Sequence, residues 1–106
     1  MIYRQGDVLI MKMSELDKKV GEGEKVKRDS GRIILAYGEV TGHAHAIHDK
    51  EAVLLEDDNR RFLQVLKDGG VDLIHEEHDT INLPKGDYEI VIQNEYSPEE
   101  IRNVRD

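Results

Sequence analysis

The sequence predicts an all-β fold, a small barrel or sandwich of about eight short strands with a short C-terminal helix. Short apolar or alternating segments recur along the chain, and clusters of Gly, Asp, Asn and Pro separate them. The chain has 106 residues, which is enough for one modest hydrophobic core and too few for a second. We therefore expect a single domain over residues 1–106.

The N-terminal half begins with a predicted buried strand, Asp7–Met13. Residues 14–24 are rich in charge and glycine, so we expect a mobile surface loop there. Asp29–Gly31 then predicts a hairpin turn between residues 25–28 and a strand over residues 32–40.

A second turn, Asp57–Asn59, predicts the pairing of the two strands beside it. Treated as a three-residue loop, it places Glu56 opposite Arg60 and Leu54 opposite Phe62. Opposite charges that face each other across two strands stabilise the hairpin by about a few tenths of a kcal/mol.

A third turn, Asp68–Gly70, has glycines that can adopt the positive φ angles of a tight hairpin. The same counting pairs Val65 with Leu73 and Leu63 with His75. His75 then shares an apolar face with these residues, so we expect its ring to point inward.

The C-terminal part contains a turn at Leu83–Gly86 and an alternating strand over residues 87–94. Ser97–Glu100 combines a capping serine, a proline at the first helical position and a glutamate three residues after the cap. This pattern predicts a short helix over residues 97–104.

The composition of the chain disfavours several classes of function. The net charge of −8 disfavours nucleic acid as a partner, because a negative surface repels phosphates. The chain has no cysteine, so neither a disulfide nor a thiolate–metal site can form. Its apolar runs are too short to span a membrane, and the first residues lack a secretory apolar segment. We expect a cytoplasmic protein without a membrane partner.

The segment Gly42-His43-Ala44-His45-Ala46 is the most informative motif. On a strand, His43 and His45 project on one face and the two alanines on the other. Alternate imidazoles on one face can bind a single ion, although two ordinary histidines near a sheet edge would show the same pattern.

His75 and His78 extend this motif, because a buried imidazole needs partners for its two ring nitrogens. A bend at Glu76–Glu77 would turn His78 toward the same site, whereas without it His78 lies in a solvated loop. The predicted metal ligands are thus His43, His45, His75 and His78. Imidazole ligands fit Zn²⁺ best, and Ni, Cu, Fe or Mn are alternatives.

Three carboxylates are candidates for a further ligand or a general base: Glu39, Glu77 and Glu89. Each could equally be a surface charge. The sequence has no nucleophile elbow and no phosphate-cradling glycine loop.

Segments such as Gly38–His45 and His75–His78, together with Leu83-Pro-Lys-Gly-Asp-Tyr88, resemble a set of small bacterial and phage proteins of unknown activity. A second resemblance is to cupins, whose two motifs are similar to His43-x-His45 and Pro84-x-Gly86. That resemblance implies metal ligation by the first motif. Glu51 stands late for the cupin glutamate, and Glu89 occupies the place of the second-motif histidine.

Three functions follow as alternatives. The first is a metal-binding protein, in which the ion could activate water or polarise a substrate as part of a metal-dependent enzyme. The second is a non-catalytic binding or assembly module with structural histidines. The third is metal-free acid/base catalysis by histidine. The partner would be a small molecule or a second copy of the chain in a homo-oligomer.

Overall fold

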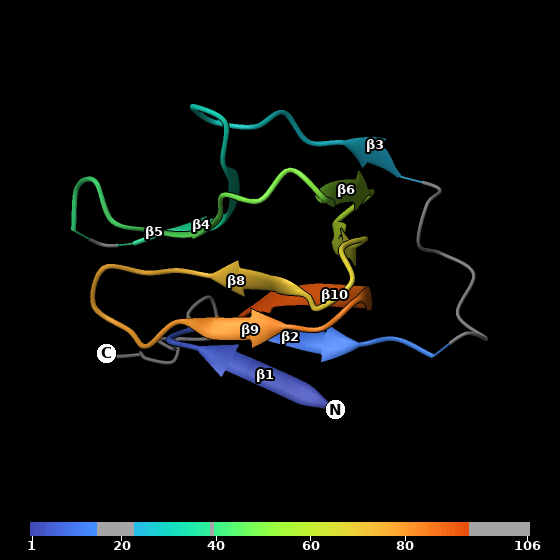
Figure 1. Ribbon diagram of the computed structural model, residues 1–106. Coiled ribbons are helices and arrows are strands. Elements are labelled where there is room, and N and C mark those ends of the chain that lie inside the picture. The colour runs from blue at the N-terminus through green and yellow to red at the C-terminus, as the bar shows by residue number, and fades with distance from the viewer. Residues whose placement is uncertain (15–22, 39, 94–106) are drawn as a thin grey trace.

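The chain folds as two facing layers of β-strands, which the computed structural model in Figure 1 shows. The structure describes residues 1–14, 23–38 and 40–93. Its strands are β1 (Ile2–Gln5), β2 (Val8–Lys12), β3 (Glu24–Lys25), β4 (Ile33–Tyr37), β5 (Ala44–Ile47), β6 (Ala52–Asp57), β7 (Arg60–Val65), β8 (Val71–Leu73), β9 (Ile81–Leu83) and β10 (Gly86–Ile92). The predicted all-β class is confirmed, and the open layers form a sandwich.

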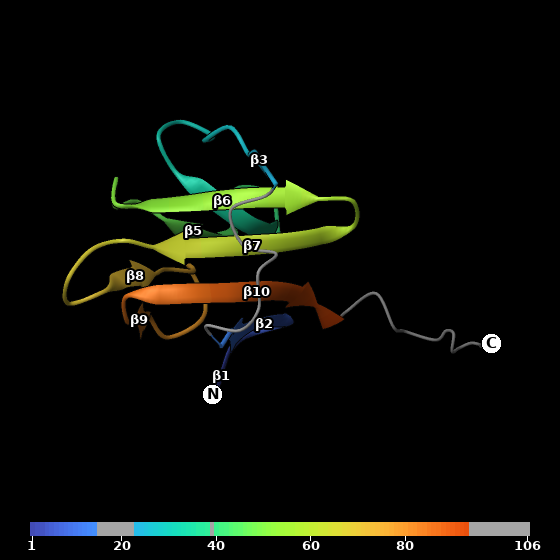
Figure 2. The same cartoon turned by 90° about the vertical axis from the view of Figure 1, so that its right-hand side faces the viewer.

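The first layer is a six-stranded antiparallel sheet with the order β1-β2-β10-β7-β6-β3. Figure 2 shows most of these strands running side by side. Strand β10, the last described strand, lies in the middle of this sheet between β2 and β7, so it pairs with a strand from the start of the chain.

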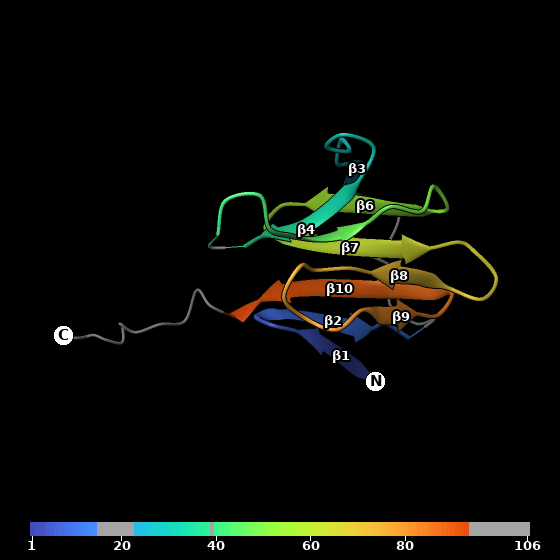
Figure 3. The ribbon, with the colours of Figure 1, turned by 60° about the vertical axis from the view of Figure 1, so that its left-hand side comes forward.

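The second layer consists of two hairpins, β4–β5 and β8–β9. They are joined where Ala46 and Ile74 each donate a backbone hydrogen bond of 2.9 Å to the other. In Figure 3 these hairpins lie in front of β7, β10 and β2. This junction between β5 and β8 is the structural basis of the site described below.

The core lies between the two layers because strands such as β2 and β4 turn alternate apolar side chains inward. In β2 the buried residues are Val8 and Ile10, and in β4 they are Ile33 and Leu35. Tyr88 of β10 is also buried, and its hydroxyl donates to the carbonyl of Pro84 at 2.5 Å. Burial raises the pKa of this hydroxyl to about 12.

Arg61 of β7 connects the layers at an irregular point of β4. The pairing of β4 with β5 shifts register between Ile34 and Ala36. Such a bulge disturbs the hydrogen-bond ladder of a sheet. The Arg61 guanidinium donates to the carbonyl oxygens of Leu35 at 2.7 Å and Ile34 at 3.2 Å, so it supplies donors where the ladder is irregular.

The hairpin between β6 and β7 departs from the prediction by one residue. Its turn consists of Asp58–Asn59 alone, and Leu54 lies opposite Leu63 while Glu56 lies opposite Arg61. The predicted three-residue turn is therefore wrong. Asp58 adopts a φ of 56°, a left-handed conformation that suits a two-residue hairpin and that aspartate tolerates.

The predicted hairpin between β7 and β8 does not exist. Strand β8 pairs with β9, and β10 occupies the position beside β7. Gly69 and Gly70, with φ of 87° and 86°, lie in the turn that takes the chain from the first layer to the second. Leu63 therefore does not pair with His75. His75 is nevertheless buried, with 9% of its surface exposed.

The remaining local predictions have mixed outcomes. The turn at Asp29–Gly31 is present, since Asp29 and Arg32 exchange backbone hydrogen bonds of 2.8 and 3.0 Å. The segment before it, however, pairs with β6 and not with β4. Glu24 begins β3 instead of ending a loop, while residues 15–22 and the predicted helix over 97–104 lie outside the described residues. Among the described residues, no helix has the length and apolar character needed to cross a bilayer.

Gly70 and Gly69 provide a matched test of how the chain passes between layers. A Cβ on Gly70 would lie 2.5 Å from the carbonyl oxygen of Leu83, whereas a Cβ on Gly69 would meet nothing within 4 Å. Both positions have positive φ, so Gly69→Ala should cost about 1 kcal/mol in unfolding free energy. Gly70→Ala should cost roughly 2 kcal/mol more, because the backbone must shift. Urea unfolding measures both, and equal losses would contradict this packing.

Candidate functional site

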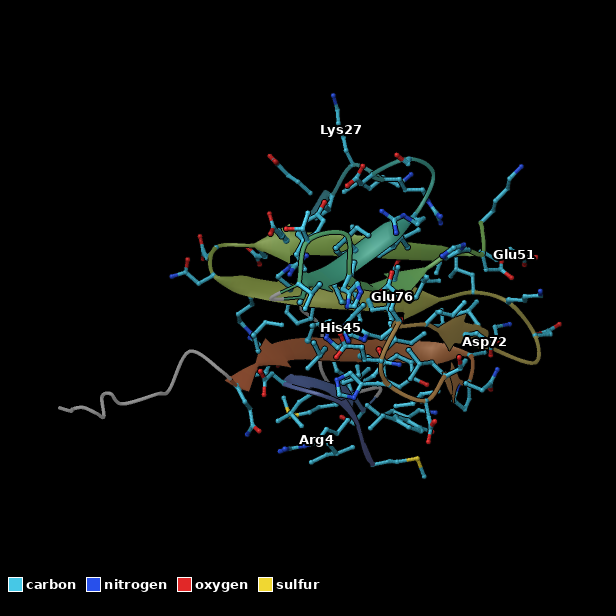
Figure 4. All side chains as sticks on the ribbon, turned by 90° about the vertical axis from the view of Figure 1, so that its left-hand side faces the viewer. Arg4, Lys27, His45, Glu51, Asp72 and Glu76 are labelled. Carbon is cyan, nitrogen blue, oxygen red and sulfur yellow. The ribbon has the colours of Figure 1, made fainter. Side chains whose placement is uncertain are left out.

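A pocket of about 320 Å³ opens at one end of the sandwich, between the first layer and the β4–β5 turn. All four histidines predicted as ligands line it: His43, His45, His75 and His78. In Figure 4 the labelled His45 and Glu76 lie close together near the centre of the view.

The junction of β5 and β8 explains why distant histidines meet. Ala46 and Ile74 are bonded to each other through their backbones. Their chain neighbours His45 and His75 consequently lie side by side, with ring centroids 4.3 Å apart. His43 precedes β5 by one residue, and His78 lies in the connection between β8 and β9.

His75 is the central ring of the cluster. Its centroid lies 5.9 Å from that of His43 and 4.7 Å from that of His78. The rings of His45 and His78 are nearly parallel, with centroids 5.9 Å apart. The structure thus brings both histidine pairs into one group.

Two glycines allow this close approach. A Cβ on Gly6 would lie 2.8 Å from Nε2 of His78, and a Cβ on Gly38 would lie 3.3 Å from Nε2 of His75. Any larger residue at either position would take up space that the imidazoles now occupy.

Gln5 fixes the protonation pattern of His45. The Gln5 side chain is 2% exposed, and its Nε2 donates to the carbonyl oxygens of Leu73 at 3.0 Å and Asp79 at 2.9 Å. These bonds orient the amide, so its Oε1 faces Nδ1 of His45 at 2.8 Å and must accept. Nδ1 of His45 therefore carries the proton, and Nε2 keeps its lone pair.

His45 stays neutral at physiological pH. Burial and the neighbouring rings of His75 and His78 lower its pKa to about 4, against the opposing effect of Asp7 and Glu76. A neutral imidazole with a free Nε2 can accept a proton or bind a metal ion.

Glu77 contacts two of the histidines in different ways. Its carboxylate Oε2 lies 2.8 Å from Nδ1 of His43, although the pair lacks good hydrogen-bond alignment. Its backbone N–H donates to Nδ1 of His75 at 3.0 Å. In a neutral ring this leaves the proton of His75 on Nε2.

Glu76 closes the site from the β8–β9 connection. Its carboxylate accepts a hydrogen bond of 3.0 Å from the backbone N–H of Ala44, which lies between His43 and His45 in the chain. This bond, helped by the nearby histidines, lowers the pKa of the Glu76 carboxyl. Glu76 thereby holds the bend that carries His78 toward the pocket.

The candidate carboxylates have different positions. Glu77 lines the pocket. Glu89 lies elsewhere, because Arg60 binds its two carboxylate oxygens at 2.9 Å each. Glu39 lies outside the described residues. His48, the remaining histidine, is exposed and does not line this pocket.

Four further residues contact or line the site and were not predicted as site residues from the sequence: Gln5, Asp7, Tyr37 and Glu76. One local feature distinguished Gln5: it is a polar residue at the end of the first strand, directly before Gly6. Its partners come from three other segments, which local patterns cannot reveal.

The cluster is not arranged as a finished metal centre. Within the part of the chain that the structure describes, no three His, Asp or Glu side chains stand where they could hold one ion. The amide of Glu77 on Nδ1 of His75 gives one physical reason, because that ring presents a proton on Nε2. Ion binding by His75 would need its ring to turn.

The low pKa of His45 predicts a pH-dependent stability. The folded pKa of about 4 lies below the ordinary 6.5, so the unfolded chain binds the proton more readily between these values. The stabilisation is complete above the unfolded value and is lost as the pH falls through the folded one. Urea unfolding with a chelator should show a loss on the order of 3 kcal/mol from this group. His45→Gln should lack it, and His48→Gln should keep it; identical pH profiles for all three proteins would refute the assignment.

The Gln5 hydrogen bonds predict a large effect of Gln5→Leu. The change removes the donor to two carbonyl oxygens and leaves the Nδ1–H of His45 without its acceptor, at a cost of about 2–4 kcal/mol in unfolding free energy. Gln64→Leu, at a half-buried position in β7, should change stability by about 0.5 kcal/mol or less. Nitrogen-15 NMR of the imidazoles should show a single Nδ1–H tautomer for His45 in the native protein and a mixture in Gln5→Leu. A small effect with an unchanged tautomer would show that Gln5 does not orient His45.

Comparison with known proteins adds a family. The model of a domain of unknown function (DUF8820) matches residues 4–93, which include every described histidine and Gln5. No curated protein and no solved structure matches the chain. Because the match covers well over half of its length, the chain belongs to the DUF8820 family.

Proposed function

We propose that the pocket is a metal-binding site formed by His43, His45, His75 and His78, with Zn²⁺ as the best-fitting ion. The observation that carries the proposal is the convergence of the imidazoles: the ring centroids of His45, His75 and His78 lie 4.3 to 5.9 Å from one another, and that of His43 lies 5.9 Å from His75. Imidazoles around one tetrahedral zinc, with Zn–N bonds of about 2.0–2.1 Å, have centroids roughly 5 Å apart. Ni, Cu, Fe and Mn accept the same donors.

The environment of two rings supports this proposal. Metal-bound histidines usually donate their other N–H to a carboxylate or an amide oxygen. Nδ1 of His45 donates to Gln5, and Nδ1 of His43 lies beside the Glu77 carboxylate. Nε2 is then the free nitrogen of each ring. His45 is already neutral, so it can bind an ion without losing a proton.

The proposal requires a local rearrangement, because the amide of Glu77 occupies Nδ1 of His75. If His75 turns, four histidines surround the ion and the site is closed, as in structural zinc centres. If His75 keeps this bond, the other three rings must move closer together, and His43, His45 and His78 then provide three ligands. An ion with an open position polarises a substrate oxygen or activates water, which would make the protein a metal-dependent enzyme. The ligand pattern of the cupin resemblance agrees with the involvement of His43 and His45.

A metal-free acid/base function is the second candidate, and a specific contact favours it. His75 presents Nε2–H as a donor, while neighbouring His45 presents Nε2 as an acceptor. A donor and an acceptor imidazole in one pocket can move a proton to and from a bound molecule. Such activity would be unaffected by chelators.

Zinc titration tests the main proposal. Chelator-treated protein should bind about one equivalent of Zn²⁺ by calorimetry and gain thermal stability, because an ion that binds only the folded state stabilises it. His45→Asn and His75→Asn should lower the affinity by about tenfold or more. His48→Asn, the exposed control, should bind as the native protein does.

Two outcomes would contradict the metal site. One is binding of less than about a tenth of an equivalent with no thermal stabilisation by Zn²⁺ or Ni²⁺. The other is native affinity in both site variants. If the variants remain folded but lose an oligomer seen by light scattering, the histidines act in assembly instead.

A further inference from the structure

The pocket has a second half that the histidines do not use. Its lining includes five apolar or aromatic residues from three strands and the β4–β5 turn: Val8, Ala36, Tyr37, Val40 and Ile92. The polar residues and these apolar residues line the same open pocket. Pockets for small organic molecules typically combine an apolar wall with a few polar groups.

Two of these apolar residues are unusually open to solvent. Tyr37 is 67% exposed and Val40 is 53% exposed, and both lie at the pocket. Exposed apolar surface beside a cavity is a common mark of a binding site. The other large exposed hydrophobic residues in the described chain, such as Leu66, do not line this pocket.

Tyr37 is held in place although it is exposed. It ends β4 and pairs with Ala44 of β5, and its hydroxyl donates to Oδ2 of Asp29 at 2.5 Å. Fixed at both its backbone and its hydroxyl, the ring loses little freedom when a flat group stacks on it.

The charges at the pocket are of one sign. Among the described lining residues there are two acidic side chains, Asp7 and Glu77, and no lysine or arginine. The whole chain carries a net charge of −8. A carboxylate or phosphate entering this pocket would meet negative potential without a guanidinium or ammonium partner.

We propose that this pocket binds a small uncharged or cationic molecule with a flat apolar group, which stacks on Tyr37 while its polar end faces the histidines. The inference rests on the same pocket as the proposed metal site, and it concerns the ligand's class. At 320 Å³ the cavity lies at the small end of ligand pockets. The polar end is a hydroxyl or an amine, since Nε2 of His45 has a lone pair that can accept a hydrogen bond from either group.

Three probes of one shape test the ligand's charge: benzylamine, benzyl alcohol and benzoate. Each is titrated into chelator-treated protein and followed by amide NMR shifts, with Gly38, His45 and Ile92 as reporters. Benzylamine and benzyl alcohol should bind, and benzoate should bind about tenfold more weakly. Asp7→Asn should narrow that difference. Benzoate binding as tight as that of benzylamine, or no binding of any probe, would overturn the inference.

Tyr37→Ala tests the stacking surface against a matched control. It should weaken benzyl alcohol binding by about fivefold, the scale of one aromatic contact. Leu66→Ala removes another exposed apolar side chain, which is 51% exposed and lies away from the pocket, and this change should leave binding unaltered. Unchanged binding in Tyr37→Ala would refute the role of this ring.

Zinc titration of Tyr37→Ala separates the two proposals. Tyr37 is not a proposed ligand of the ion, so this variant should bind Zn²⁺ as the native protein does. If the native protein binds zinc normally but binds none of the probes, the metal-site proposal is supported and the proposed class of small-molecule ligand is wrong. If the native protein binds the probes but not zinc, the small-molecule proposal is supported and the metal-site proposal is wrong.

Discussion

The buried amide of Gln5 is the interaction on which the arrangement of the site depends. One side chain from β1 accepts from His45 in β5 and donates to the backbone at Leu73 and Asp79. It therefore holds the first layer, the β4–β5 hairpin and the β8–β9 connection at one point. A buried amide must satisfy its donors and its acceptor together, so these segments cannot move independently without leaving a polar group unpaired.

This constraint also determines the chemistry of the cluster. Burial and the neighbouring rings of His75 and His78 disfavour the charged form of His45 and lower its pKa to about 4. The proton of His45 is directed to Nδ1 by Gln5, and that of His75 to Nε2 by the amide of Glu77. Adjacent rings consequently present an acceptor and a donor. That asymmetry is what makes the pocket suited either to an ion, after a ring turns, or to proton transfer.

The sandwich places this cluster at an end because of how its second layer is assembled. The hairpins β4–β5 and β8–β9 meet at a single pair of backbone bonds between Ala46 and Ile74. The pocket lies beside this junction, and its lining combines the imidazoles with apolar residues of the first layer and of the β4–β5 hairpin. Gly6 and Gly38 leave the room for these rings.

The sequence by itself determined the class of fold, the alternation that buries Tyr88 and Ile90, and the turns at Asp29–Gly31 and Leu83–Gly86. It also singled out the four histidines, because residue type and local spacing are properties of short segments. The sequence did not correctly predict every pair of neighbouring strands. Local counting paired β7 with β8, whereas β10 takes that place, since any strand with an apolar face can complete the sheet.

Only the tertiary structure decided how the site is built. His75 is buried, as its apolar surroundings in the sequence suggested, but through the β5–β8 junction and not through the predicted hairpin. The roles of Gln5, Glu76 and Tyr37 arise from contacts with residues distant in the chain. A hydrogen bond or a stacked ring needs a partner at a given distance and angle, and long-range packing alone sets that geometry.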